Sequence, residues 1–150
     1  MENKDYKKAE EILAEIYRNA QLALQSISDI MPQVDDEEVK KELVSQHEAY
    51  EQFSAKAAML AKDRNIELKE PNPFKKAMMW GSIKMNTLTD NSRAHIAEMM
   101  IQGTVMGITS LRTSATEASA KADETDEIIT LLNEMIEREE IFEKRWKKYL

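Results

Sequence analysis

Apolar residues recur along the first 31 residues at spacings of three and four, the repeat of an α-helix. The pattern predicts one amphipathic helix over residues 5–31, which ends before Pro32 because proline cannot continue a helix. Its apolar stripe consists of Ala9, Leu13, Ile16, Ala20, Ala23, Ile27 and Ile30. The opposite side carries Glu11, Glu15, Arg18 and Gln25. The pattern therefore predicts a helix with one face on a core and one polar face.

A second helix is predicted over residues 36–64, where Asp35 or Asp36 can cap the N-terminus. Its stripe consists of Val39, Leu43, Gln46, Tyr50, Phe53, Ala57 and Leu60. Because only a short acidic turn separates this helix from the first, the two are expected to be antiparallel neighbours.

The next part of the chain is predicted to be a long crossover with a short helix over residues 74–88, after Pro71 and Pro73. Two further long helices are predicted over residues 92–118 and 124–149. Four helices of similar length indicate an all-α four-helix bundle, a single domain over residues 1–150. The crossover is long enough to return the chain to the end where the second helix began, which favours an up-down-down-up order.

Composition agrees with helices and excludes several kinds of chemistry. The chain has 3 Gly and 3 Pro among 150 residues and no Cys, so disulfides, thiolate zinc sites and cysteine nucleophiles are excluded. A net charge of −7, with 28 acidic and 21 scattered basic residues, argues against nucleic-acid binding. Neither an apolar N-terminal segment nor an uncharged apolar span is present. We therefore expect a cytoplasmic protein without membrane association.

The stretch AHIAEMMIQGTVMGI at 94–108 raises the question of a metal-binding helix, since His95 stands one turn before Glu98. On a helical wheel both fall on a polar arc, and we interpret them as a solvated pair. The opposite arc holds Ala97, Met100, Ile101, Thr104, Gly107, Ile108, Leu111 and Ala115. Gly103 and Gly107 are interpreted as a notch for the close approach of a neighbouring helix.

Glu139 stands at the centre of the apolar stripe of the last helix, where a carboxylate needs polar partners. The second helix offers Gln46 and Tyr50, with His47 at the edge, and the third offers Thr104. We predict that Gln46, Tyr50, Thr104 and Glu139 form one buried polar layer that fixes helix register. A mononuclear metal site made by Glu139 and His47 is the alternative. Four methionines predicted to fill the core are Met99, Met100, Met106 and Met135.

A four-helix bundle with one long crossover and a central polar layer resembles the ferritin-like superfamily, most of all its short uncharacterised bacterial branch, a ferritin-like domain of unknown function. In metal-bearing members, two helices each supply a Glu and two supply a Glu-x-x-His pair to a di-iron or di-manganese site. The resemblance thus implies an iron or manganese oxidase or metal-handling protein. Only Glu139 matches this pattern, because Phe142 follows it and Thr104 stands where an inward Glu is expected. The di-metal site is therefore predicted to be lost.

Three hypotheses for function follow, the third being a small apolar ligand held between the helices, which the methionines would suit. The first is a non-catalytic bundle that acts by association, because the crossover helix is apolar on two sides. One side carries Phe74, Ala77, Met78, Met85 and Leu88, and the other carries Met79, Trp80 and Ile83. The second set is the predicted association face, most simply in a homodimer; a different protein partner has no signature in the sequence. The second hypothesis is the metal-dependent protein that the resemblance implies. No nucleophilic triad or phosphate-binding loop is present, so no catalytic residue, substrate or cofactor is predicted.

Overall fold

The computed structural model describes residues 2–69, 90–119 and 126–150, with side chains for 9–69, 90–116 and 126–150. This part of the chain is all-helical, and all four long helices predicted from the sequence are present, with ends within three residues of the predicted ones. They are α1 (Glu2–Ile30), α2 (Glu37–Asp63), α4 (Arg93–Ser119) and α5 (Glu127–Lys147), with a short 3-10 turn η1 (Met31–Gln33) after α1. The crossover helix predicted over 74–88 lies outside the described residues.

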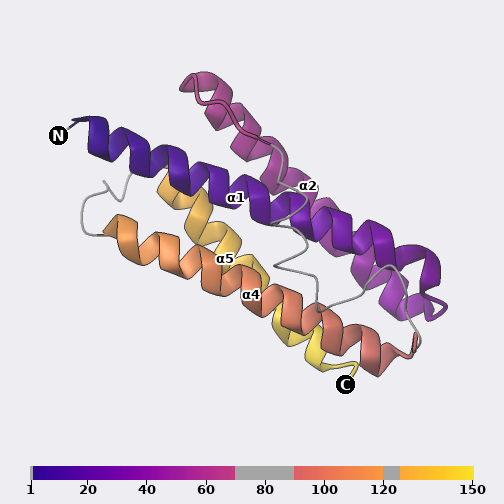
Figure 1. Cartoon of the computed structure of the whole chain (residues 1–150). Coiled ribbons are helices and arrows are strands. Elements are labelled where there is room, and N and C mark those ends of the chain that lie inside the picture. The colour runs from indigo at the N-terminus through magenta and orange to yellow at the C-terminus, as the bar shows by residue number, and fades with distance from the viewer. Residues whose placement is uncertain (1, 70–89, 120–125) are drawn as a thin grey trace.

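The four helices pack side by side, and each lies antiparallel to its two neighbours (Figure 1). Helix α1 contacts α2 and α4, helix α5 also contacts α2 and α4, and α1 touches α5 across the centre. Polar pairs mark the two ends. Arg93 at the start of α4 pairs with Asp36 at the start of α2, and Arg64 after α2 pairs with Asp126 before α5. Helices α1 and α5 therefore run in one direction and α2 and α4 in the other.

The core lies where the apolar stripes of the four helices meet. Its largest fully buried side chains are Trp146, Phe142, Leu13, Ile16, Ile27, Ile30, Leu43, Ile96, Leu111, Ile128, Leu132 and Met135. Burying a side chain of this size stabilises a fold by about 1.5–3 kcal/mol relative to leaving it exposed. The stripes predicted for α1 and α2 are buried from Leu13 to Ile30 and from Val39 to Ala57, whereas Ala9 and Leu60 at their ends are half-buried.

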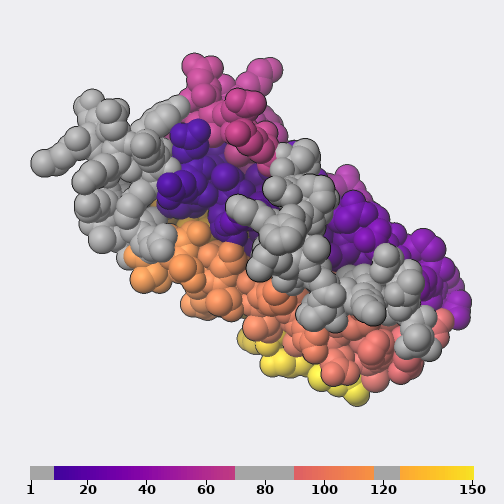
Figure 2. Space-filling view, in the orientation of Figure 1, coloured from indigo at the N-terminus to yellow at the C-terminus, as the bar shows by residue number. Residues whose placement is uncertain are grey.

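Two predictions about helix faces are corrected. Glu15 and Arg18 were assigned to the polar face of α1, but Glu15 is only 7% exposed and its carboxylate contacts both Arg18 and Ser110 of α4. The reason is that α1 contacts three other helices, so this flank of the helix faces α4 rather than solvent. Figure 2 shows the surfaces of α1 and α4 lying against each other. Met106 was predicted in the core but is exposed, because α4 has more apolar positions than its buried face can take.

The helix ends are held by side chains that also join neighbouring helices. Asp36, one of the two caps predicted for α2, accepts hydrogen bonds from the backbone N–H groups of Glu38 and Val39 and from Nε of Arg93 at 2.7 Å. The bond from Val39, then the one from Arg93, lowers the pKa of Asp36 below its ordinary value. The Arg93 guanidinium also lies 5.6 Å above the Tyr149 ring. One arginine thus joins α4 to the start of α2 and to the C-terminal residues after α5.

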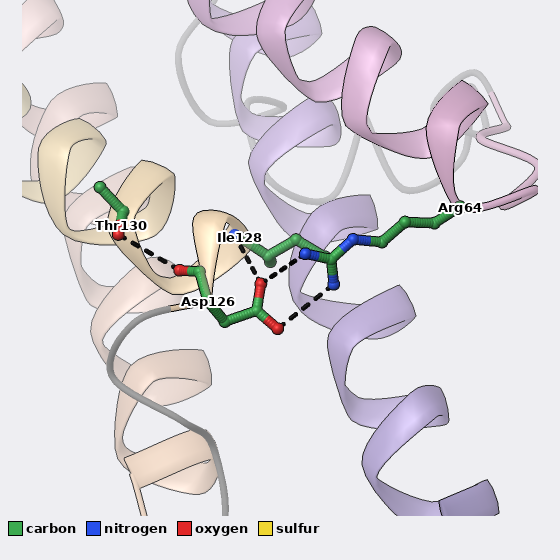
Figure 3. A network of polar contacts seen from close by, with 4 residues as sticks. All are labelled: Arg64, Asp126, Ile128 and Thr130. Carbon is green, nitrogen blue, oxygen red and sulfur yellow. Dashed lines mark hydrogen bonds and ion pairs between the residues drawn. The ribbon is translucent and has the colours of Figure 1, made fainter.

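A second ion pair, between Arg64 and Asp126, joins two helix ends at the opposite end of the bundle (Figure 3). Asp126 accepts from the N–H of Ile128, which caps α5, and from Nη1 and Nη2 of Arg64 at 3.2 and 2.8 Å. Helix α2 ends beside it at Asp63. Asn65, just after the helix, has a left-handed φ of 55°, and the N–H of Ile66 bonds back to the carbonyl of Ala61. This is a Schellman ending, in which asparagine tolerates the left-handed position. The end of α2 and the start of α5 are thereby fixed together.

A buried carboxyl group as the candidate functional site

Glu139 lies on the inner face of α5 and is 1% exposed. The Tyr50 hydroxyl, brought by α2, donates a hydrogen bond to Oε1 of Glu139 at 3.2 Å. Tyr50 is itself buried, with its ring 5.6 Å from the ring of Phe142. Of the polar residues predicted around Glu139, Tyr50 is the one that donates to it, because both side chains project from the apolar stripes of α2 and α5, which are packed together.

Helix α1 supplies a further partner, Asn19, which is 6% exposed. Its Nδ2 donates a hydrogen bond to the backbone carbonyl of Gly107 in α4 at 3.2 Å. A Cβ on Gly107 would lie 2.9 Å from both Oδ1 of Asn19 and Oε2 of Glu139. A side chain at this position would have to displace the ends of these two side chains, so glycine lets both of them reach α4. Gly107 does allow neighbouring groups to come close to α4, as predicted, but these groups are the side chains of Asn19 and Glu139.

The surroundings of Glu139 favour its uncharged form. Burial raises the pKa of Glu139 to about 8, although hydrogen bonding to Tyr50 and then to Asn19 lowers it. Burial, followed by the charge of Glu139, raises the pKa of Tyr50 well above its ordinary value, so the phenol stays a donor. Oε2 of Glu139 is buried and receives no hydrogen bond of normal geometry. The site is thus a carboxyl group with one satisfied oxygen and one that faces the Asn19 amide.

The other two residues of the predicted polar layer are buried but bonded elsewhere. Gln46 accepts a hydrogen bond from the Trp146 indole at 2.9 Å and donates one to Glu42. Thr104 donates to the carbonyl of Met100, one turn earlier in its own helix, at 2.6 Å. Gln46 thus satisfies a buried indole N–H, and neither residue hydrogen-bonds to Glu139. The predicted layer consists of separate polar contacts instead of one network.

The residues around Glu139 do not fit a di-iron or di-manganese centre. A centre of this kind needs several carboxylates and imidazoles, whereas Tyr50 and Asn19 add only a phenol and an amide. His47, the other residue of the weak metal alternative, lies on a half-exposed part of α2 with Nδ1 2.6 Å from Glu51. Throughout residues 2–69, 90–119 and 126–150, no group of three or more His, Asp or Glu side chains is placed to hold a metal ion.

The second candidate pair, His95 and Glu98, lies near the N-terminus of α4. Glu98 is exposed and His95 is half-buried, which agrees with the interpretation that they are solvated. A shallow groove of about 370 Å³ lies elsewhere, between α2 and α5. Its lining includes Lys56 and Glu134, which form an ion pair at 3.8 Å across it. Oppositely charged side chains on its rim give this groove no preference for one class of ligand.

Asn19 is the residue that sequence reasoning missed. The apolar stripe predicted for α1 runs through Ile16 and Ala20 and contains no polar residue. Helical spacing contains a signal, since Asn19 lies three residues after Ile16 and four before Ala23, both buried. An asparagine on that line, with an inward glycine on α4, indicates a polar contact across the core.

Comparisons of the chain with models of protein families, with curated proteins and with solved structures find no match in any of the three. The residues themselves therefore carry the functional argument. Among the helices of the described part of the chain, none combines the length and apolar character required to cross a membrane.

We expect Tyr50→Phe to lower the free energy of unfolding by about 0.5–1.5 kcal/mol near pH 6, where its acceptor is mostly uncharged. The loss should grow above about pH 8, since hydrogen bonds to an ionised carboxylate are roughly twice as strong. Urea denaturation at both pH values measures this. Tyr149→Phe is the matched control, because that ring is half-exposed beside Arg93. Equal effects of the two variants at both pH values would contradict the assigned role of the Tyr50 hydroxyl.

Proposed function

We propose that this protein is a non-catalytic ferritin-like four-helix bundle that acts by association with a second copy of itself or with another protein. The helix directions support an up-down-down-up bundle with one long connection, the arrangement of ferritin-like folds. In this proposal, the layer that holds two metal ions in metal-bearing members is a polar contact within the core.

The observation that carries the proposal is that the Glu139 carboxyl group and its partners are buried. Glu139, Tyr50 and Asn19 are 1%, 3% and 6% exposed, so no substrate reaches this carboxyl group. A catalytic acid or base has to approach a reacting group within hydrogen-bond distance. The buried polar groups therefore support a structural role, and any function is carried by the surface.

The metal-dependent alternative finds less support from the donor set. Two divalent cations beside a single carboxyl group would lack the negative charge and the imidazoles that hold them. Glu139 also has its Oε1 engaged with Tyr50. We therefore propose no resident iron or manganese.

The association face is proposed to be the one predicted from the sequence, Met79, Trp80 and Ile83, which lies outside the described residues. On the described part of the chain the exposed large apolar side chains are dispersed over several elements, namely Val44, Met59, Val105, Met106, Ile141 and Leu150. Single exposed apolar residues of this kind are normal on soluble folds. They offer a weaker association surface than the three apolar residues of the crossover helix predicted from the sequence.

Metal content and molecular mass, measured on the same preparation, test the proposal. Protein purified without chelator is expected to contain iron and manganese far below one ion per chain, and light scattering should give twice the 17.3 kDa chain mass. Combining Trp80→Glu with Ile83→Lys should halve the mass and leave the helical circular dichroism intact, since charge is not tolerated in an apolar interface.

The matched control is Val44→Lys combined with Met59→Glu, which makes the same kind of change at two exposed positions of α2. This variant should remain a dimer. Wild-type protein that is monomeric and captures no partner, or a stoichiometric metal that raises the melting temperature, would overturn the proposal. Dissociation by the control but not by the Trp80 and Ile83 changes would refute the assigned face.

A further inference from the structure

We propose that Glu139 is a built-in proton-binding site, in which the carboxyl group carries a proton on Oε2 and donates it to Oδ1 of Asn19. The hydrogen bonding of Asn19, between Glu139 of α5 and Gly107 of α4, then follows that proton. This inference concerns the interior of the chain and does not depend on its oligomeric state.

The orientation of the Asn19 amide is the first step. Its Nδ2 donates to the carbonyl of Gly107 at 3.2 Å, so the amide presents Oδ1 as its remaining acceptor. Oδ1 of Asn19 and Oε2 of Glu139 both lie 2.9 Å from one point, the position that a Cβ on Gly107 would take. Nδ2 of Asn19 lies 3.0 Å from the same point, so the whole end of the amide shares this small space with the carboxyl group. A proton on Oε2 lets the carboxyl group donate a hydrogen bond to Oδ1, the acceptor of that amide.

The second step is the unsatisfied state of Oε2. The Tyr50 hydroxyl is used on Oε1, and Oε2 is buried with no donor in normal geometry. A buried carboxylate oxygen without a donor costs a large desolvation energy, and such groups usually take up a proton. The raised pKa of Glu139, caused first by burial, agrees with this placement of the proton.

The groups packed around Glu139 offer no compensating positive charge. Helix α2 contributes the Tyr50 phenol, α1 contributes the Asn19 amide, and α4 contributes Gly107, which has no side chain. Charged side chains on adjoining turns are paired with each other instead, Arg18 with Glu15 and Arg112 with Glu140. The ionised state of Glu139 is therefore left without an ion-pair partner among the described residues.

Loss of the proton should change the hydrogen bonding of the Asn19 amide. Its Nδ2 carries two N–H groups, of which one serves the Gly107 carbonyl. Because hydrogen bonding to Asn19 lowers the pKa of Glu139, the second N–H group can serve the ionised carboxylate. Deprotonation of Glu139 should therefore turn the Asn19 amide from an acceptor into a donor toward Oε2.

Carbon-13 NMR of protein labelled at glutamate side-chain carboxyls tests the inference. One carboxyl resonance should titrate with a midpoint near 8 and should be missing in Glu139→Gln. The side-chain N–H signals of Asn19 should shift with the same midpoint. Glu137→Gln is the matched control, since Glu137 is exposed on the same helix and its replacement should leave that resonance in place.

Infrared spectra of wild-type protein keep the test valid even if a variant fails to fold. A band of a protonated carboxyl group, shifted by carbon-13 labelling of glutamate, should be present near pH 6 and should disappear above about pH 9. Titration of every carboxyl group below about pH 6 would overturn the inference. Asn19 signals that ignore the titration of Glu139 would overturn the assigned acceptor.

Discussion

Replacing Glu139 with Gln is expected to remove most of the pH dependence of stability between about pH 5 and pH 8. The pKa of Glu139 is raised from an ordinary 4.5 to about 8 in the folded chain, so folding binds a proton that the unfolded chain has released. The stability that this proton contributes is fully present below about pH 4.5 and is lost as the pH rises through about 8. The slope is roughly 1.4 kcal/mol per pH unit within that window.

Gln is the appropriate replacement because its amide mimics the protonated carboxyl group. Its oxygen can accept from Tyr50 and its N–H group can donate to Oδ1 of Asn19. We therefore expect the variant to be about as stable as wild type near pH 5 and to become more stable by several kcal/mol above about pH 8.

Urea denaturation of wild type and Glu139→Gln over this pH range gives the difference directly, and titrations common to both proteins cancel. Glu137→Gln should follow the wild-type curve, since it alters an exposed glutamate on the same helix. Parallel curves for wild type and Glu139→Gln would show that Glu139 is ionised throughout. A loss of several kcal/mol in Glu139→Gln at every pH would instead indicate an essential charge.

The helices could be predicted because their signals are local. Apolar spacing and the turn after Pro32 define α1 and α2, and Asp36 is a cap that the sequence offers beside its helix. The start of α5 was predicted at residue 124 but lies at Glu127. Several acidic residues of the stretch 122–127 can cap a helix. The cap in the structure is Asp126, which also pairs with Arg64. That choice depends on a contact between residues far apart in the chain.

The candidate site was predicted in part for the same reason. A lone carboxylate in an apolar stripe predicts that Glu139 is buried, and the stripe of α2 offers Gln46 and Tyr50 as partners without deciding between them. The structure places Tyr50 there. The partner of Gln46 depends on axial register, which sets it beside Trp146 instead of Glu139. Asn19 is buried because its side of α1 packs against α4. The apolar pattern of one helix does not reveal which of its sides packs against another helix.

Introducing a side chain at Gly107 should have the second large effect. A Cβ there would lie 2.9 Å from Glu139 Oε2 and from Asn19 Oδ1, closer than packed atoms allow. Overpacking of this kind costs about 1–3 kcal/mol, and displacing a buried hydrogen-bonding group adds about 1–3 kcal/mol. Replacing a helical glycine restores only about 0.5 kcal/mol through propensity. Gly107→Val should therefore be strongly destabilised in a urea melt, whereas Thr109→Val, an exposed change on the same helix, should be nearly neutral.

A double-mutant cycle shows whether the clash is with the polar contact itself. Gly107→Ala and Asn19→Ala should each destabilise the protein, the first by crowding Asn19 and Glu139, the second by leaving the Gly107 carbonyl without its donor. In the double variant the new methyl group enters space that Asn19 has vacated, so the combined loss should be smaller than the two losses added, by about 0.5–3 kcal/mol. Strict additivity would mean that Gly107 and Asn19 act independently, and the close approach of α1 to α4 would then need another cause.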